Sequence, residues 1–313
     1  MQGASTAAAP ASTALAEGAG KRALITGLHG FTGRYLAREL EQAGYRVFGS
    51  VMHGEAAGAD TFVVDLCDRA AVQAMVEQVQ PDVVAHLAAI SFVAHANADA
   101  IYQVNLLGTR HLLEALAACP HKASCVLLAS SANVYGNAAV EVIDESVAPA
   151  PSNDYAVSKL AMEHMAALWR EQLPLTIVRP FNYTGVGQHE NFLLPKIVSH
   201  FRRGARDIEL GNLAVARDFS DVRMVANVYR RLLAAAPAGQ SFNVCSGVAH
   251  SLGEVIDMVG QIAGYHINVH VNPAFVRAND VLRLLGSNAR LRAAIGALEP
   301  VPLADTLRWM FQA

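Results

Sequence analysis

The sequence predicts an α/β fold: a Rossmann-type, doubly wound parallel sheet with a smaller C-terminal α/β lobe that binds substrate. Short apolar runs alternate with helical stretches of about a dozen residues, which is typical of βαβ units. The runs lack polar alternation, as in parallel strands that helices cover on both faces. A glycine-rich turn follows the first run. Beyond Phe181 the pattern loosens, and this change predicts the smaller lobe.

The elements of the sheet follow in chain order. The first strand is expected at Arg22–Ile25, and apolar residues at helical spacing predict a helix from Tyr35 to Ala43, which Gly44 ends. Further strands are expected at 46–51, 61–64, 83–87, 125–129, 175–178 and 242–244, and further helices at 68–79 and 105–116.

Three regions are expected in the chain. Residues 1–20 are mostly Ala, Ser, Thr and Gly, without the basic start and Leu-rich stretch of a secretory signal, and predict a disordered tail. Residues 21–180 form a dinucleotide-binding domain, to which 213–246 return. The substrate-binding lobe comprises 181–212 and 247–313.

Composition excludes several classes of protein. The net charge of -3 gives no indication of a nucleic-acid or membrane-surface partner, and no apolar run approaches the ~20 residues that span a bilayer. The 4 cysteines are scattered without a CxxC pair, which favours a reduced thiol protein over a disulfide framework or a zinc site. We therefore expect a cytoplasmic protein without a metal.

A turn with three glycines joins the first strand to the first helix. The first glycine permits a tight turn, the second lets the backbone approach a phosphate, and the third allows close helix–strand packing. The helix N-terminus offers free N–H groups and a partial positive charge to a pyrophosphate. The turn thus predicts a dinucleotide site that includes Gly27, Gly30, Phe31, Thr32, Gly33 and Arg34.

The end of the second strand bears on which dinucleotide binds. An NAD site typically has an acidic residue there, ~20 residues past the turn. Here residues 49–54 contain none, and the first acid is Glu55. Because Arg34 and His53 are available for a 2′-phosphate, NADP(H) is the predicted preference, with NAD(H) use left open. Asp65–Leu66 ends the third strand, where the carboxylate either accepts a bond from the adenine amino group or caps the next helix.

A serine, a tyrosine and a lysine form the predicted catalytic group. Tyr155 and Lys159 are four residues apart on one face of a helical stretch. A nearby ammonium lowers a phenol pKa that starts near ~10, so that Tyr155 can pass a proton to a developing alkoxide. Ser131 ends a strand and can donate to the same oxygen. The group predicts hydride transfer to or from a carbonyl carbon.

Together these motifs resemble the nucleotide-sugar branch of the extended short-chain dehydrogenase/reductase family, from Arg22 to Phe311. The motifs are the glycine turn, 65–66, 86–89, 104–109, 130–136, 155–159, 179–182, 217–219, and Arg277 with Asp280. The resemblance implies that Ser131 is the catalytic serine and Tyr155 the general acid/base. It also implies that Lys159 binds the nicotinamide ribose, and that the cofactor is further lined by Leu66, Leu87, Ala88, Ala89 and Phe181. Asn105 is either near the site or a plain packing amide.

Three segments, 178–188, 192–198 and 217–223, most resemble GDP-4-keto-6-deoxy-D-mannose reductases. Dehydratases of the branch carry an acid after the catalytic serine, where this chain has Ala132 and Asn133. The resemblance implies NAD(P)H-dependent reduction of the C4 ketone to give GDP-D-rhamnose. Met224 departs from the Asp that such reductases often have. The implied substrate residues are Ser91, Ser131, Asn182, Lys196, Arg217, Arg223, Arg277 and Asp280.

Two other functions stay open at this point. An NAD-dependent nucleotide-sugar 4-epimerase uses the same three catalytic residues. A dinucleotide sensor without catalysis is a second alternative, although such proteins usually lose the tyrosine or the lysine. The family also commonly dimerises through two helices, here expected at 101–116 and 155–173, which implies a homodimer.

Overall fold

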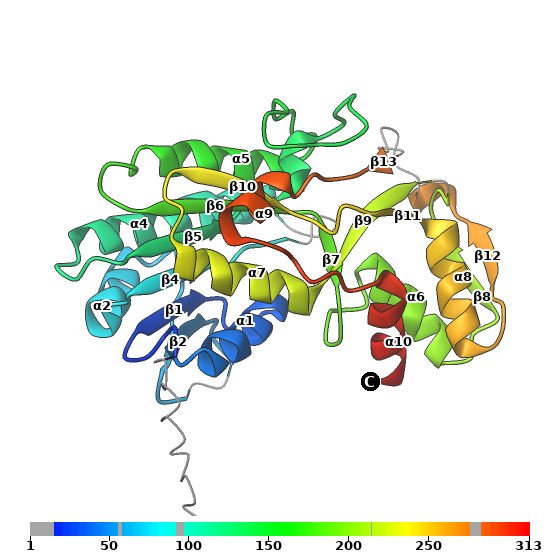
Figure 1. The fold of residues 1–313 in the computed structure, drawn as a ribbon, viewed down its shortest axis with the longest axis horizontal. Coiled ribbons are helices and arrows are strands. Elements are labelled where there is room, and N and C mark those ends of the chain that lie inside the picture. The colour runs from blue at the N-terminus through cyan, green and yellow to red at the C-terminus, as the bar shows by residue number, and fades with distance from the viewer. Residues whose placement is uncertain (1–15, 56–57, 92–96, 214, 276–282) are drawn as a thin grey trace, which may run out of the picture.

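The computed structural model describes residues 16–55, 58–91, 97–213, 215–275 and 283–313. Its centre is a seven-stranded parallel sheet with the strand order β10-β6-β5-β4-β1-β2-β3 (Figure 1). This order confirms the predicted doubly wound fold. The strands are β1 (Arg22–Thr26), β2 (Arg46–Val51), β3 (Thr61–Val63), β4 (Val83–His86), β5 (Cys125–Ala129), β6 (Leu175–Pro180) and β10 (Gln240–Val244).

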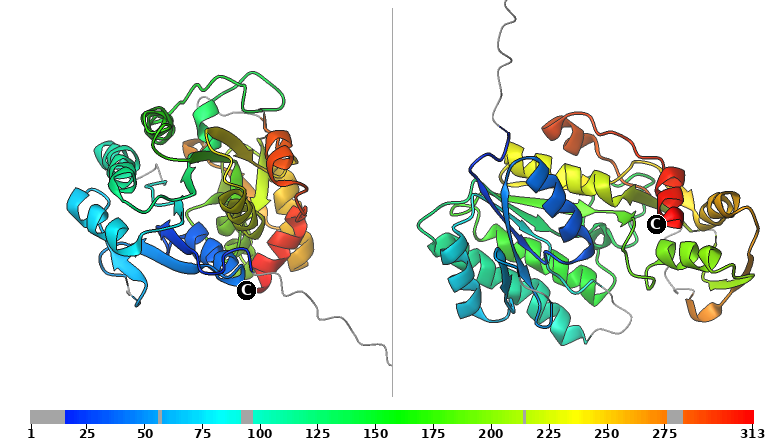
Figure 2. Two further views of the ribbon diagram at one scale, coloured as in Figure 1. Left: turned by 60° about the vertical axis from the view of Figure 1, so that its left-hand side comes forward. Right: turned by 90° about the horizontal axis from the view of Figure 1, so that it is seen from below.

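Helices pack on both faces of this sheet (Figure 2). One core joins the sheet to α2 (Arg69–Val79), α4 (Thr109–Ala118) and α5 (Asp154–Ala167). A second core, on the other face, includes α1 (Phe31–Gln42), α7 (Val222–Ala235) and α9 (Ala289–Ile295). Burial on both faces explains why the strands are continuous apolar runs.

The smaller lobe has a core of its own. It lies between α6 (Leu193–Arg202), α8 (Leu252–Ala263), α10 (Leu303–Gln312) and a two-stranded parallel sheet. That sheet pairs β8 (Asp207–Leu210) with β12 (Asn268–Val271). A further sheet connects the lobes and consists of β7 (Asn182–Thr184), β9 (Ala216–Asp221), β11 (Ala249–Ser251) and β13 (Arg283–Leu284). The short 3-10 segments are η2 (Ala132–Tyr135) and η3 (Pro273–Phe275).

Several element boundaries differ from the predicted ones. The first helix begins at Phe31 rather than Tyr35, because Gly30 is its extended N-cap residue. The predicted helix 105–116 is interrupted: α3 (Ala98–Tyr102) continues into a π-helical turn, η1 (Gln103–Gly108), before α4. The helix from Tyr155 ends at Ala167, short of residue 173.

The last residues of the segment predicted as a tail pack on the first lobe. Residues 17–20 form a turn in which Gly18 N donates to Ala43 O at 2.8 Å. Glu17 forms an ion pair with Arg230 of α7 at 2.6 Å. These contacts attach the segment to the first lobe. Residues 1–15 lie outside the described part of the chain.

We propose a division into two lobes close to the one that the sequence suggests. β10 joins the large sheet and α7 covers it, so residues 213–246 return to the first lobe. α9 belongs there as well, because it packs against α7 and β10. This moves one helix out of the predicted segment 247–313. Among the described residues, no helix is long and apolar enough to span a membrane.

Candidate active site

The glycine turn has the shape that a pyrophosphate requires. Gly27 has φ +75°, and its N–H and that of Leu28 donate to Ser50 O at 3.1 and 3.0 Å. A Cβ at Gly33 would overlap the carbonyl oxygens of Gly27 and Leu28. Helix α1 has no side-chain cap and no acid in its first turn. Its N–H groups and its dipole are therefore available to an anion, and the turn fits a dinucleotide.

A chain of buried polar side chains joins the carboxyl ends of β1 and β4 to α4. Thr26 Oγ1 lies 2.7 Å from His86 Nδ1, and His86 Nε2 lies 2.8 Å from Thr109 Oγ1. Burial lowers the pKa of His86 to about 3, so the imidazole is neutral. The chain fixes these two strand ends, where the strand order reverses and ligands bind in such sheets.

Asn105 holds the segment after β4 against helix α5. Its amide exchanges two bonds with the backbone of Ile90, at 2.8 and 3.1 Å, and donates to Ser158 Oγ at 3.1 Å. It sits in the π-helical turn, a deviation often found at functional sites. Asn105 thereby positions Leu87, Ala88 and Ala89 beside the glycine turn, where Ala88 N donates to Thr26 Oγ1 at 3.3 Å.

The structure brings the three predicted catalytic side chains together. Ser131 is the N-cap of η2, where its Oγ accepts from Asn133 N at 3.1 Å, and its side chain acts to lower the pKa of Tyr155. Lys159 Nζ lies 6.0 Å from the centroid of the Tyr155 ring and donates to Ala129 O at 2.7 Å. The helix α5 that carries both residues begins at the cap Asn153, whose side chain accepts from Ala156 N at 2.9 Å.

The predicted acidification of the phenol is not what the structure shows. Burial raises the pKa of Tyr155 to about 12, and Tyr183 adds to this, whereas the bond from Ser131 opposes it. Lys159 is not among the groups that lower it, and its ammonium donates to Ala129 O. Burial lowers the pKa of Lys159 itself to about 8, against the effect of Glu163. At neutral pH the phenol is thus protonated, which is the form that donates a proton.

Tyr183 is a site residue that the sequence reasoning missed. It comes from β7 in the sheet that connects the lobes, and its hydroxyl lies 2.7 Å from Thr32 Oγ1. Its ring is stacked on Phe31 with centroids 6.0 Å apart. Tyr183 therefore packs on the start of α1, and it also acts to raise the pKa of Tyr155. It follows Asn182 directly, which is the only signal that could have indicated it.

The residues expected to contact a 2′-phosphate have other partners in the structure. Arg34 donates to Gly187 O at 3.3 Å, so its guanidinium points to the second lobe. Glu55, absent from the predicted site, returns to the glycine turn and pairs with His29 at 3.2 Å. The turn after β2, in which Glu55 N donates to Met52 O at 3.2 Å, brings it there. A carboxylate is thus present near the end of β2, contrary to the expectation.

Three further residues were predicted to contact the cofactor, and the structure gives the surroundings of each. Asp65 accepts from Cys67 N at 2.9 Å, and the cap of α2 is Asp68, so Asp65 is not the helix cap. Leu66 is buried in the core against α2 and α4. The Phe181 ring is also buried, in a cluster with Tyr135, so its side chain belongs to a core cluster.

The predicted substrate residues that the structure describes have different surroundings. Asn182 is exposed on β7 and Ser91 is exposed after β4. Arg217 donates to Ala216 O at 3.0 Å. Arg223 pairs with buried Asp221 at 2.7 Å and covers Trp309, so it joins the lobes. Arg277 and Asp280 lie outside the described residues.

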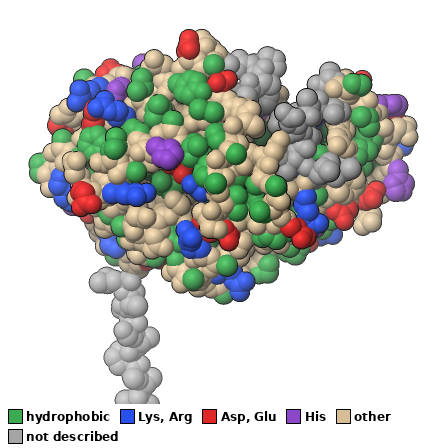
Figure 3. Space-filling model, turned by 90° about the horizontal axis from the view of Figure 1, so that it is seen from above, with side chains coloured by type: hydrophobic (Ala, Val, Ile, Leu, Met, Phe, Trp, Pro, Cys, Tyr) green, Lys and Arg blue, Asp and Glu red, His purple; other side chains and the backbone are tan. Residues whose placement is uncertain are grey.

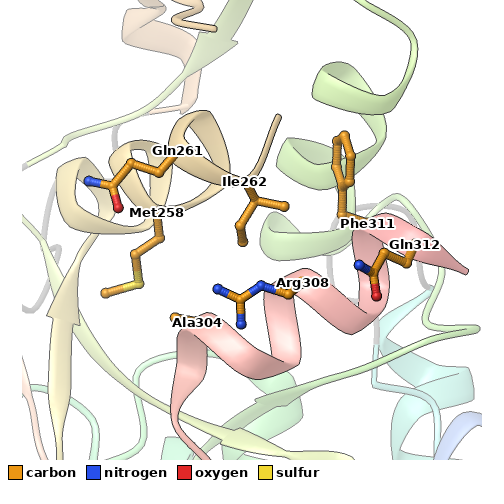
Figure 4. A pocket seen from close by; sticks show the side chains of 7 residues that line it. All are labelled: Met258, Gln261, Ile262, Ala304, Arg308, Phe311 and Gln312. Carbon is orange, nitrogen blue, oxygen red and sulfur yellow. The ribbon is translucent and has the colours of Figure 1, made fainter. Parts of the chain in front are cut away.

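Lys196 lines a cavity of about 360 Å³ in the smaller lobe. Its Nζ donates to Glu209 O at 2.9 Å and lies 4.7 Å from the centroid of the Phe275 ring. A second cavity, also about 360 Å³, lies between α8 and α10 and includes no predicted site residue (Figure 4). On the face in Figure 3, basic and acidic side chains are interspersed, with no field of one sign.

The family model described as GDP-mannose 4,6 dehydratase matches residues 24–310. The chain belongs to this family. It is 34% identical over 276 residues to a GDP-6-deoxy-D-talose 4-dehydrogenase from Aggregatibacter actinomycetemcomitans, with 87% of this chain and 90% of the relative covered. It is 36% identical over 239 residues to a GDP-6-deoxy-D-mannose reductase from Pseudomonas aeruginosa, with 73% and 78% covered.

Solved structures agree with this placement in the GDP-mannose 4,6 dehydratase family. A chain from Burkholderia cenocepacia J2315, provisionally named an epimerase, is 53% identical with a TM-score of 0.89, and 94% and 98% of the chains are covered. RMD from Pseudomonas aeruginosa, complexed with NADPH, is 32% identical with a TM-score of 0.81, and 93% and 98% are covered. The chain is thus a nucleotide-sugar oxidoreductase of the short-chain dehydrogenase/reductase type.

Proposed function

We propose that this enzyme reduces the C4 ketone of GDP-4-keto-6-deoxy-D-mannose to give GDP-D-rhamnose, with NADP(H) preferred and NAD(H) also used. The observation that carries the proposal is the group of Ser131, Tyr155 and Lys159 at the end of β5. The names of the two curated relatives, which act on GDP-6-deoxy sugars, support the substrate class. The NADPH complex of RMD supports the cofactor.

The side chains of the site divide the reaction between them. When bound, the nicotinamide supplies the hydride that C4 of the sugar receives. Ser131 Oγ and Tyr155 Oη hold the ketone oxygen, and Tyr155 gives that oxygen its proton as the C–H bond forms. The Tyr155 phenolate then regains a proton from solvent. Because the pKa of Tyr155 is raised to about 12, the phenol stays protonated until the oxyanion develops.

The residue after the catalytic serine supports reduction over dehydration. Ala132 follows Ser131 and is buried, and Asn133 comes next. Neither side chain can act as the acid that eliminates water in the dehydratases of this branch. The family name therefore describes the fold and the nucleotide-sugar site, whereas the proposed activity is reduction.

A turnover assay tests the proposal. Purified protein is mixed with NADPH and freshly prepared GDP-4-keto-6-deoxymannose, and oxidation of NADPH is followed by absorbance. Tyr155→Phe is the control, with a loss of about 10²-fold or more expected because the proton donor is absent. NMR of the product decides the configuration at C4, on which the two named relatives differ. No oxidation of NADPH by the parent protein would refute the proposal.

A second candidate is an NAD-dependent nucleotide-sugar 4-epimerase, which the provisional name of the 53% identical structure favours. Such an enzyme keeps NAD bound through the reaction. Denaturing the freshly purified protein and analysing the released nucleotide separates the two. Stoichiometric NAD, with interconversion of nucleotide sugars and no added cofactor, would favour the epimerase. A sensor without catalysis is less well supported, because tyrosine and lysine are both present.

We also propose a cytoplasmic homodimer that associates through α4 and α5. Val157 on α5 and Leu107 in η1, the turn that leads into α4, are large apolar side chains exposed on adjacent elements. An exposed apolar face of this kind commonly marks a protein interface. Light scattering that gives the mass of one chain would contradict the dimer.

A further inference from the structure

A buried ion pair lies beneath the catalytic residues. Glu163 on α5 and Arg179 on β6 are 6% and 7% exposed, and their charged groups meet at 2.6 Å. Taking two charges out of water costs free energy, and an apolar pair of similar volume is often at least as stable. A contribution to stability therefore does not explain why the pair is present. The reaction proposed above uses neither side chain.

The Glu163 carboxylate connects the catalytic helix to the serine segment. Its Oε1 accepts from Ser130 Oγ at 2.5 Å and from Arg179 Nε at 2.9 Å, and its Oε2 accepts from Arg179 Nη2 at 2.6 Å. Ser130 directly precedes Ser131, and Lys159 lies one helical turn before Glu163. A single carboxylate is thus next to the supports of two catalytic side chains.

Arg179 keeps this carboxylate in place. Its Nη1 donates to Tyr135 Oη at 2.9 Å, and that hydroxyl donates to Asn243 Oδ1 at 2.7 Å. Tyr135 and Asn243 are both fully buried. The guanidinium is therefore anchored to η2 and to β10, and the carboxylate has one well-defined position.

The charge of Glu163 also acts on the Lys159 ammonium. Among the described residues, the other titratable groups around Lys159 are Tyr155 on the same helix, His86 on β4 and Arg179 behind the carboxylate. Tyr155 and His86 are uncharged at neutral pH, as their pKa values of about 12 and about 3 indicate. Burial favours the neutral amine, and Glu163 opposes that effect. Loss of the carboxylate should therefore lower the pKa of Lys159, so that the ammonium loses its proton at a lower pH than in the parent.

The geometry points to Glu163 as a positioning residue: it fixes Ser131 through Ser130 and keeps Lys159 charged for the nicotinamide ribose. This role rests on the proposed function, because it assigns Lys159 to that ribose. Glu163 is 6% exposed, and it acts through its two neighbours.

Glu163→Gln tests the proposal, because Gln keeps the shape and the acceptor for Ser130 but loses the charge. We expect the alkaline limb of NADPH binding, measured by fluorescence without sugar, to move down by about one pH unit. The alkaline limb of kcat should move with it. Ser130→Ala is the matched control: it keeps the carboxylate, so kcat should fall at every pH while both limbs stay in place.

An unmoved binding limb in folded Glu163→Gln would overturn the proposal. If circular dichroism shows that this variant does not fold, Glu163→Gln combined with Arg179→Met removes both charges and leaves neither unpaired. The same downward shift is expected there. A double variant that also fails to fold would overturn the proposal, since the pair would then serve folding itself. Because NADPH binding needs no sugar, an inactive parent enzyme would count against the proposed function alone.

Discussion

At the residue scale, Lys159 lowers the stability of the fold. It is 3% exposed, and burial lowers its pKa from 10.5 to about 8. The unfolded chain therefore binds more protons between these pH values, so the free energy of unfolding rises with pH across that window, and the charged side chain is destabilising below it. Lys159→Met should abolish reduction yet have a Tm at pH 7 equal to or above that of the parent. The difference should shrink as the pH approaches 10.5. Thermal unfolding at several pH values measures this, and a lower Tm throughout would contradict it.

The preference for NADPH over NADH is expected to depend on Glu55 and His29. The adenosine ribose of a dinucleotide lies near the end of β2, where this pair is found. Two charges near 4 Å in water interact by about 1 kcal/mol, so removing the carboxylate should strengthen NADPH binding about fivefold. Glu55→Gln should therefore raise the NADPH-to-NADH affinity ratio, measured by fluorescence titration. His29→Gln, which leaves Glu55 without its partner, should lower the ratio. Equal ratios in parent and Glu55→Gln would place the discrimination elsewhere.

At the scale of elements, the contact between α1 and the glycine turn depends on Gly33. A Cβ there would overlap the backbone oxygens of Gly27 and Leu28, which cannot move without changing the turn. Gly33→Ala should destabilise the fold by about 1–3 kcal/mol and weaken NADPH binding. Gly253→Ala in α8 is the control, because its Cβ would meet only Ser251 Oγ, at 3.8 Å, and Ala favours a helix by about 1 kcal/mol. Denaturant unfolding compares the two variants. A stable Gly33→Ala protein that binds NADPH as the parent does would contradict this reading.

Much of this architecture could be predicted, because strands that are buried on both faces are visible as continuous apolar runs. The predicted strands recur in the large sheet, and Ser131, Tyr155 and Lys159 meet as expected. What the sequence could not indicate depends on contacts between distant segments. Tyr183 reaches Thr32 across 151 positions of the chain. The π-helical turn at Asn105 and the turn that returns Glu55 to the glycine segment likewise have no local pattern.

At the scale of the whole molecule, the two lobes meet beside the start of the cofactor helix. Tyr35 Oη donates to Val186 O at 2.7 Å, and its ring packs edge-on against Trp309 of α10. Tyr183 packs on Phe31 at the same junction. These contacts fix the second lobe relative to the glycine turn. A nucleotide that binds to the second lobe should then raise the Tm of the protein whether or not the dinucleotide is bound.

A panel of nucleoside diphosphates tests that assignment and the base of the substrate. A ligand that binds only the folded state raises its stability, by about 2.7 kcal/mol at a concentration of 100 Kd. We expect GDP to raise the Tm more than UDP or dTDP. Lys196 lines one of the two cavities of the smaller lobe, so Lys196→Met should reduce the GDP shift and leave the NADPH shift unchanged. Equal shifts for the three diphosphates would remove the guanine preference. A loss of both shifts in Lys196→Met would show that the lobes do not bind their ligands independently.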